Sequence, residues 1–458
     1  MPPQLPFLII GAGLAGSECA WQLARRGVPT VLVEMRPAKM SPAHHGDKAA
    51  ELVCSNSLRS NDIFNAVGLL KEEMAGLDSL VIRAAYAAQV PAGTALAVDR
   101  DIFSNAVEAA LKTLPNLKRV SGEVIRIDHE GDGVILHFAS GEKLSGQRTV
   151  IATGPLTADP LAAWLKEQTQ NDSLYFYDSI APIVDAQSID RKTAFMAARY
   201  GRGDTEEGDY INCPMTEAEY QAFIAAILEA ELAEVHDFDK AQFFEGCLPI
   251  EEMVRRGPET LRFGPMKAVG ITNPHAPESR PYAIVQLRQD NRHASLYNMV
   301  GFQTRMKWPE QKRIFRMIPG LAKAEFVRMG SMHRNTYVCS PLVLDQTFAL
   351  KNFTGVHLAG QITGCEGYVE SAAIGLMVGL ILAAQMQSRD FSLPPASTAL
   401  GALVHHILGG DPENYQPMNV NFGLFTDIPE RARKKIDRKV DLIKRASADF
   451  RSWFYRSI

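Results

Sequence analysis

The hydrophobic pattern at the start of the chain predicts a strand, a helix and a second strand in close succession. Residues Phe7–Ile10 form an uninterrupted apolar run, which is typical of a strand buried on both faces. Six residues, Gly11-Ala12-Gly13-Leu14-Ala15-Gly16, follow directly, and a helical pattern then continues to about Arg26. A second apolar run over residues 30–33 ends in Glu34. This order predicts a strand–turn–helix–strand unit of about thirty residues that is suited to binding a dinucleotide.

Each glycine of the turn has a separate physical role in such a unit. Gly11 permits the tight turn, Gly13 lets the backbone approach a pyrophosphate, and Gly16 lets the helix pack closely on the strand. The helix N-terminus then stabilises the phosphate charge. The carboxylate of Glu34 is placed to accept hydrogen bonds from ribose hydroxyls. We therefore expect the cofactor to contact Gly11, Ala12, Gly13, Leu14, Ala15, Gly16, Glu34 and Arg36.

Later patterns favour FAD over NAD as this dinucleotide. An amphipathic helix is predicted from Asp99 to about Leu114. Three short strands at residues 120–128, 133–138 and 149–152 are predicted to form a small meander. A further buried strand at 355–361 precedes an Ala- and Gly-rich helix at 368–385. This order resembles that of the large class of FAD-dependent oxidoreductases.

The predicted fold is α/β: a two-dinucleotide-binding-type FAD domain, with a Rossmann-like parallel sheet and a β-meander, an inserted α+β domain and a basic C-terminal helix. We expect the first part of the FAD domain at 1–156, the inserted domain at 157–329, the second part of the FAD domain at 330–400, and a linking stretch with the C-terminal helix at 401–458. In the inserted domain, Thr216 and Glu219 predict a capping box that starts a helix ending near Ala233, and strands are predicted at 282–287 and 296–301. Residues 388–430 are predicted to be a linking stretch, and the last helix to start near Pro429. Its apolar face is predicted from Ile436, Val440, Ile443, Phe450 and Phe454.

Charge and cysteine usage narrow the function classes. The chain of 458 residues has a net charge of −4, but from Arg431 to its end ten Lys/Arg stand against three Asp/Glu, a local +7, so the rest carries −11. A basic tail on an acidic body indicates a polyanionic partner. A second basic cluster, Arg305, Lys307, Lys312, Arg313 and Arg316, is a further candidate for phosphate contacts.

Six scattered cysteines without a CxxC pair argue against disulfides and against a metal site, and favour a reducing, cytoplasmic compartment. No run of eighteen apolar residues and no signal peptide is found, so no membrane association is expected.

Several segments resemble one family, the folate- and FAD-dependent tRNA (uracil-5-)-methyltransferases (TrmFO). They are Glu51-Leu-Val-Cys-Ser-Asn-Ser-Leu-Arg-Ser60, Tyr210-Ile-Asn-Cys-Pro-Met215, Phe244-Glu-Gly-Cys-Leu-Pro-Ile-Glu251, Arg262-Phe-Gly-Pro-Met-Lys267, Met332-His-Arg-Asn-Thr-Tyr337 and Ala359-Gly-Gln-Ile-Thr-Gly364. They are spread over nearly the whole chain. The related carboxymethylaminomethyl-uridine family shares the flavin fold and the Gly-Gln turn.

The resemblance implies methylation of uracil carbon-5, in the T-loop of tRNA, with methylenetetrahydrofolate as carbon donor, reduced FAD as hydride source and NAD(P)H as reductant. It implies Cys213 as the nucleophile and Cys54 as the general base. It also implies that His333 stacks on the pterin, that Arg334 meets the folate's glutamate or an RNA phosphate, and that Asn335 belongs to the same folate- or RNA-binding set. Gly360, Gln361 and Gly364 are implied to contact the flavin. No obligate protein partner is evident.

Alternatives remain open at this point. On the residues alone, Cys54 and Cys213 can each be an inert core thiol, and His333 a structural histidine. The same chemistry on a ribosomal RNA uridine, a small-molecule FAD oxidoreductase, and a flavin-binding scaffold that only binds RNA are the competing hypotheses.

Overall fold

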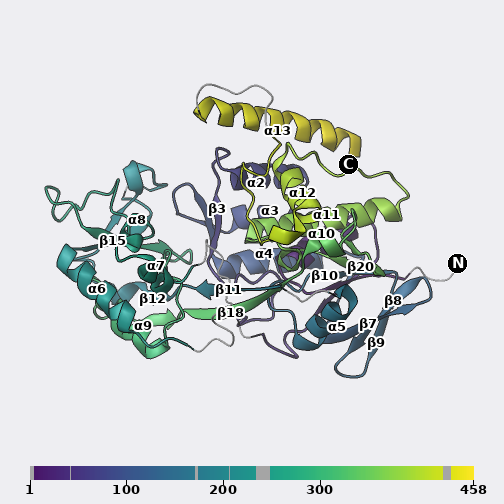
Figure 1. Ribbon diagram of the computed structural model, residues 1–458, viewed down its shortest axis with the longest axis horizontal. Coiled ribbons are helices and arrows are strands. Elements are labelled where there is room, and N and C mark those ends of the chain that lie inside the picture. The colour runs from purple at the N-terminus through teal and green to yellow at the C-terminus, as the bar shows by residue number, and fades with distance from the viewer. Residues whose placement is uncertain are drawn as a thin grey trace.

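The structure, a computed structural model, describes residues 5–41, 43–170, 174–205, 207–233, 248–426 and 435–457; within these, the side chains of 174–179, 332–334 and 435–437 are outside the description. Two bodies lie side by side (Figure 1). The larger contains the glycine turn, and the smaller contains most of residues 181–328. They are connected by a two-stranded antiparallel ribbon, β11 (Leu174–Ile180) and β18 (Ser331–Tyr337).

The larger body is built on a six-stranded sheet in the order β19-β20-β10-β1-β2-β6. Its strands are β1 (Phe7–Ile10), β2 (Thr30–Glu34), β6 (Leu117–Ser121), β10 (Arg148–Ile151), β19 (Ala349–Leu350) and β20 (Phe353–Leu358). All pairs are parallel except β19–β20. The central strands are apolar and buried on both faces, as parallel sheets require. The predicted Rossmann-like parallel sheet is confirmed.

The predicted meander is correct in kind but wrong in its members. It consists of β7 (Val124–Glu130), β8 (Gly133–Phe138) and β9 (Lys143–Gly146). Residues 149–151, expected as its last strand, pair instead with β1 and β20 in the central sheet. Thr149, Val150 and Ile151 are all fully buried, and a continuous buried run is the pattern of a central parallel strand.

Helices cover both faces of this sheet. They are α1 (Leu14–Ala24), α2 (Ala66–Gly76), α3 (Leu80–Ala87), α4 (Arg100–Lys112), α5 (Asp159–Thr169), α10 (Ser340–Val343), α11 (Tyr368–Met386) and α12 (Ala399–Gly409). A small sheet of β3 (Ser57–Ser60), β4 (Gln89–Val90) and β5 (Ala95–Val98) lies on the side of the smaller body. Helix α5 packs on β7 and belongs to the core of the larger body, so the second core begins later in the chain than residue 157.

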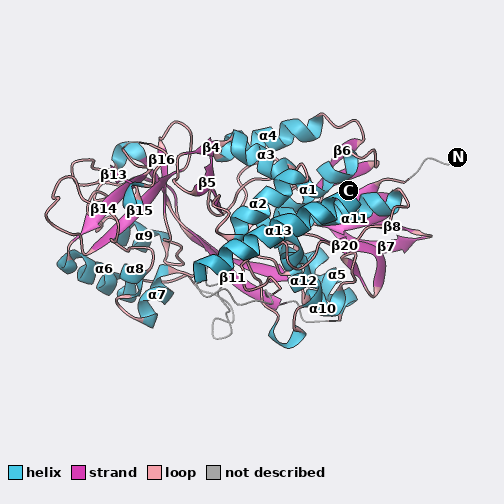
Figure 2. Cartoon of the chain, turned by 90° about the horizontal axis from the view of Figure 1, so that it is seen from above, coloured by secondary structure: helices cyan, strands magenta, loops and turns pink. Residues whose placement is uncertain are grey.

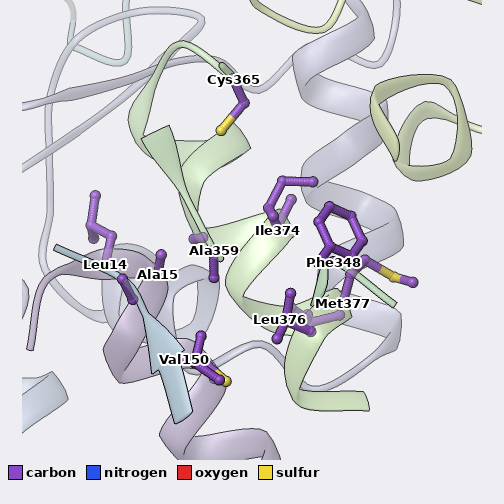
Figure 3. Close-up of a cluster of buried hydrophobic side chains, with 14 of the residues drawn as sticks. Leu14, Ala15, Val150, Phe348, Ala359, Cys365, Ile374, Leu376 and Met377 are labelled. Atoms are coloured by element: carbon purple, nitrogen blue, oxygen red, sulfur yellow. The ribbon is translucent and has the colours of Figure 1, made fainter. Parts of the chain in front are cut away.

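Helices α1 and α11 pack against each other at unusually short range. A side chain on Gly375 would overlap the backbone of Ala15, and one on Gly379 would lie 2.8 Å from Cβ of Gln22. Figure 3 shows Ala15 of α1 beside Ala359 and Ile374 in this apolar cluster. Helix α11 is long and apolar enough to cross a membrane, but it is buried inside the protein. It is a core helix of the larger body.

The smaller body has its own sheet and core. Its sheet has the order β13-β14-β15-β16-β12-β17, from β12 (Ile183–Asp185), β13 (Phe195–Ala197), β14 (Tyr210–Met215), β15 (Ala283–Gln289), β16 (Leu296–Met299) and β17 (Phe326–Arg328). It is covered by α6 (Glu217–Glu229), α7 (Ile250–Arg256), α8 (Thr260–Phe263) and α9 (Trp308–Phe315). The capping box of Thr216 and Glu219 is confirmed at the start of α6.

The expected linking stretch contains a buried helix, so that expectation was wrong for part of it. The N-terminus of α12 is capped from α2: the Glu73 carboxylate accepts hydrogen bonds from the backbone N–H groups of Ala399 and Leu400 at 2.9 and 2.7 Å. The Pro- and Gly-rich flanks on either side of α12 hid its apolar pattern. Helix α13 (Lys435–Ser457) then lies across α2, as Figure 2 shows from above. Residues 427–434, where the helix was expected to start, lie outside the described part of the chain.

Candidate functional site

A pocket of about 500 Å³ opens beyond the carboxyl ends of β1 and β2 and continues to the smaller body. Its walls include the glycine turn, the loop that holds Cys54, the first turn of α11, and Arg288, Asn298 and Val300 of the smaller body. Ligands of open α/β sheets bind at this edge. The pocket is therefore the candidate site.

The glycine turn has the shape that a dinucleotide requires. Gly11 has a φ of +101°, and a Cβ there would lie 2.6 Å from the carbonyl oxygen of Ala152. A Cβ on Gly16 would overlap the carbonyl oxygen of Gly11. Gly13 differs: a Cβ on it would meet no protein atom within 4 Å, and the residue lines the pocket. The turn thus closes tightly on the protein side and leaves space on the pocket side, so these residues fit FAD.

The acid at the end of β2 is buried and already oriented. Glu34 accepts hydrogen bonds from the backbone N–H of Ala12 at 2.8 Å and from Nε of Arg36 at 3.0 Å. Arg36 also pairs with Glu51 at 3.1 Å. Burial alone would raise the pKa of Glu34, but the hydrogen bonds and charge of Arg36 and the Ala12 amide outweigh it and hold the pKa below its usual value. Glu34 lines the pocket as an ionised acceptor, and Arg36, which orients it, lines the pocket as well.

The second predicted flavin-contacting segment also lies at the pocket. Gln361 lines it and donates to Glu366 at 2.8 Å. Gly360 has a φ of +81°, and a Cβ on it would lie 2.5 Å from the Cβ of Ala15. Only glycine therefore fits at this position against α1. Gly364 packs on Tyr415 instead. Of the three expected residues, the structure therefore brings Gln361 to the pocket surface.

The loop around Cys54 is held from both bodies. The backbone N–H of Cys54 donates to the hydroxyl of Tyr368 at 2.7 Å, and its carbonyl accepts from Arg100 at 3.0 Å. Arg100 forms an ion pair with Asp290 of the smaller body at 3.1 Å. Asn56, fully buried, donates to the carbonyls of Val98 and Gln289, both at 3.0 Å. These contacts fix Cys54 at the seam between the two bodies.

Cys54 is surrounded by cationic side chains. It interacts electrostatically with Arg100, Arg288 and Arg328. It is partly exposed and lines the pocket. Reactive cysteines occupy electropositive, accessible surroundings of this kind. Cys54 therefore lies in the wall of the candidate pocket, and its catalytic role stays a prediction.

Cys213 is placed differently, and its expected role as nucleophile is contradicted by its surroundings. It lies on β14, pairs with Val285, and is fully buried in the core of the smaller body. Burial raises the pKa of its thiol to about 12. A protonated core thiol outside the pocket lacks both the charge and the access that addition to a base requires.

The remaining predicted residues are only partly described. His333 and Arg334 belong to β18, but their side chains lie outside the described part of the structure. Asn335 is buried, and its amide nitrogen has no hydrogen-bond partner among the described residues. Cys247 lies outside the described residues altogether.

The basic cluster before β17 is largely paired within the protein. Arg305 pairs with Glu252, Lys307 with Glu231, and Arg313 with Glu310. Arg316 donates to the carbonyl of Ala324. A role of this cluster in phosphate binding is therefore not supported, because carboxylates already compensate most of its charge.

Sequence reasoning missed Arg100, Arg288 and Asn298. Arg100 directly follows Asp99, which caps the N-terminus of α4. This position at the start of a helix was the local feature of the sequence that could have pointed to Arg100. Arg288 and Asn298 lie in ordinary strand patterns, and only the pairing of β15 with β16 brings them to the pocket.

Comparisons with known proteins agree with this arrangement. Residues 6–390 match the family model described as Glucose inhibited division protein A. A protein from Acetivibrio thermocellus, "Methylenetetrahydrofolate--tRNA-(uracil-5-)-methyltransferase TrmFO", is 52% identical over 438 residues, covering 96% of each chain. A protein of the same name from Geotalea daltonii is 53% identical over 445 residues, covering 97% of each. The structure of Aquifex aeolicus GidA superposes with a TM-score of 0.71 at 16% identity, covering 98% of this chain and 73% of that one, which shows a shared fold.

The glycine turn yields a prediction that separates cofactor binding from folding. Gly13 has a φ of −72°, so a valine there is unstrained and meets no protein atom. Gly13→Val is expected to fold with an unchanged melting temperature for the apoprotein but to lose bound flavin at least about tenfold, because its side chain fills the space of the phosphates. Absorbance at the flavin band of the purified protein measures this. Gly16→Val is the contrasting variant: it should lose both fold and flavin. Full flavin content in Gly13→Val would contradict the placement.

The burial of Cys213 yields a second prediction. At pH 8, a thiol with a pKa of about 12 carries roughly one thiolate in ten thousand molecules. Iodoacetamide should therefore leave Cys213 unmodified in the folded protein and modify it only after denaturation. Peptide mass mapping of the two samples checks this; equal alkylation in both would restore Cys213 as a reactive thiol.

Proposed function

The chain belongs to the Glucose inhibited division protein A family and, within it, to the TrmFO methyltransferases, and from that premise we propose that it methylates carbon-5 of the T-loop uridine of tRNA. The observation that carries the proposal is a thiol, Cys54, held among arginines in the wall of a pocket that also contains the dinucleotide turn. The identity of 52–53% to TrmFO proteins over nearly the full length supports it. The enzyme uses FAD and methylenetetrahydrofolate.

The chemistry explains why both a thiol and a dinucleotide are needed. Carbon-5 of uracil becomes nucleophilic when a thiolate adds to carbon-6, and the proton on carbon-5 must later be removed by a base. FAD, when reduced, supplies hydride, and methylenetetrahydrofolate supplies the carbon. Cys54 is proposed as the group that removes the proton, because it lies in the pocket wall with a fixed backbone. NAD(P)H is proposed as the reductant.

The nucleophile is proposed by elimination. Cys19, Cys213, Cys339 and Cys365 are all buried, and burial raises the pKa of each. Cys54 has the role of base. Cys247 is the remaining cysteine of the chain, and it stands in a segment that resembles the family.

Strand β18 supports a folate site. The backbone N–H of Thr336 donates to the carbonyl of Pro155, which lines the pocket, so the neighbouring His333, Arg334 and Asn335 belong to a strand that passes the pocket wall. We propose that they hold the folate. The side-chain nitrogen of Asn335, which has no partner among the described residues, is the donor proposed for such a contact.

Helix α13 is proposed as a tRNA contact. Its apolar residues Ile443 and Phe450 are buried, as predicted, while Lys444, Arg451 and Arg456 face solvent. Leu442, Ala446 and Trp453 add to the buried face. The free cysteine thiols fit a reducing cytoplasm, which is the proposed location.

The thiol assignments are tested with tRNA that carries 5-fluorouridine at the target position. Fluorine cannot leave carbon-5 as a proton does, so a covalent protein–RNA adduct accumulates once a thiol has added. Cys247→Ala should give neither adduct nor methylated uridine, since the first bond cannot form. Cys54→Ala should still form the adduct but make no methylated product. Gel electrophoresis in denaturant measures the adduct, and mass spectrometry of nucleosides measures the methyl group.

Cys213→Ala is the matched control and should retain both adduct and product. An adduct lost in Cys213→Ala but kept in Cys247→Ala would reverse the assignment. Methyl transfer from S-adenosylmethionine without folate would overturn the proposed function, and methylation of ribosomal RNA alone would change its substrate.

The α13 proposal predicts a change in salt dependence. Each phosphate contact that is lost should reduce the slope of log K against log salt by about 0.7 to 0.9. The double variant Lys444→Gln/Arg451→Gln should therefore bind tRNA with a measurably flatter salt dependence in filter-binding or anisotropy titrations. An unchanged slope would show that α13 does not contact tRNA through these residues and that its role is to pack on α2.

A further inference from the structure

Two polar residues of the smaller body form a distinct wall of the pocket. Arg288 on β15 and Asn298 on β16 are direct partners across the two strands, and both line the pocket. They face it from the body that does not contain the glycine turn. Neither is used by the dinucleotide cradle described above.

Asn298 lines the pocket and has a buried side-chain donor without a partner among the described residues. The residue is 2% exposed, and its side-chain nitrogen has no partner among the described residues. A buried amide donor without an acceptor is costly, and native proteins usually retain one only where a ligand or another group completes it. Asn298 lines the pocket, so a ligand bound there lies beside this residue.

Arg288 is a buried cation that is held rigidly beside the thiol loop. Its Nε donates to Asn56 at 3.0 Å and its Nη2 donates to Ser55 at 3.1 Å, next to Cys54. The residue is 8% exposed, so the charge has little water around it, and this burial lowers the pKa of the guanidinium. Its remaining nitrogen, Nη1, has no hydrogen bond to the described part of the chain. A fixed, poorly hydrated cation is well suited to stabilise negative charge that develops on a ligand.

We propose that Asn298 and Arg288 form the subsite that holds the uracil ring of the target nucleotide by its carbonyl oxygens, with Asn298 as the specificity-determining donor. This assignment rests on the proposed function. When the thiolate adds, the S–C6 bond forms, the C5–C6 π pair becomes the C4–C5 π bond, and the C4–O4 π pair moves onto O4 to give an enolate; no electron leaves and no further reactant is needed. The donors of the subsite stabilise that oxygen more strongly than the neutral carbonyl, which accelerates the addition.

The same subsite explains selection of uracil over cytosine. Cytosine carries an amino group at carbon-4 where uracil carries an oxygen, and an amino group is a donor. In this subsite the amino group of cytosine would face the amide nitrogen of Asn298 and the guanidinium of Arg288, so that hydrogen-bond donors would face donors. Buried donors without an acceptor disfavour binding strongly, and cytosine is therefore rejected. A carboxylate at position 298 would remove this discrimination.

The test compares Asn298→Asp with Asn291→Asp, both measured as flavin-containing enzyme with full-length tRNA. Asn291 lies between the same two strands, outside the pocket, and its Oδ1 accepts from the backbone of Ser295, a role that a carboxylate keeps. Asn298→Asp is expected to lower kcat and the rate of adduct formation with 5-fluorouridine tRNA by about 100-fold. Its flavin content, melting temperature and tRNA affinity should stay close to wild type, because phosphate contacts dominate that affinity. Asn291→Asp should behave as wild type in every measurement.

If Asn298→Asp lowers the melting temperature, Asn298→Ala replaces it in the same measurement of adduct formation. This second variant removes the amide without introducing a charge. Wild-type rates of adduct formation in both variants of Asn298 would overturn the subsite. Loss of flavin from both would also overturn it, by assigning the donor to the cofactor. If the wild-type enzyme itself forms no adduct and no methylated uridine, the proposed function fails, and this outcome is recognised without any variant.

Discussion

The close packing of α1 on α11 is the constraint on which the site depends. These helices meet through Gly375 and Gly379, where any side chain would collide with α1. Forcing a larger residue into such a contact costs about 1–3 kcal/mol or displaces a helix. Because the helices touch along their length, the glycine turn before α1 and the turn at Gln361 before α11 reach the same pocket. The backbone amides at both helix starts thereby face one space.

A second set of contacts fixes the two bodies relative to the chemistry. The Arg100–Asp290 ion pair and the hydrogen bonds of Asn56 with Gln289 and Arg288 all cross the seam, and all involve the loop of Cys54 or its neighbours. The thiol of Cys54 is therefore positioned by neither body alone. Removing one member of a largely buried pair such as Arg100–Asp290 leaves an uncompensated charge, so the seam resists small changes in domain orientation.

Local sequence patterns correctly predicted those features that depend on interactions between residues close together in the chain. The glycine turn, Glu34 and the capping box of Thr216 depend on neighbours within a few residues, and all were found where expected. The third meander strand was predicted wrongly, the burial of Cys213 was left open, and the position of Arg288 and Asn298 at the pocket was not predicted. Each depends on pairing between strands or packing between segments far apart in the chain, which periodicity does not encode. The cysteine-proline pattern at Cys213 is compatible with an exposed loop and with a central strand, and only the sheet decides between them.

The pairing of α1 with α11 also has a consequence for how the polypeptide folds. Helix α1 is made of residues 14–24 and its partner α11 of residues 368–386. The core of the larger body is therefore complete only when two segments that lie very far apart in the sequence have come together. The smaller body has a separate core from residues between them and can become compact first. During synthesis, the apolar face of α1 must then wait for more than three hundred residues to be added, exposed to aggregation in the interval. Chaperone dependence of this chain should therefore be governed by the first helix rather than by the domain that follows it.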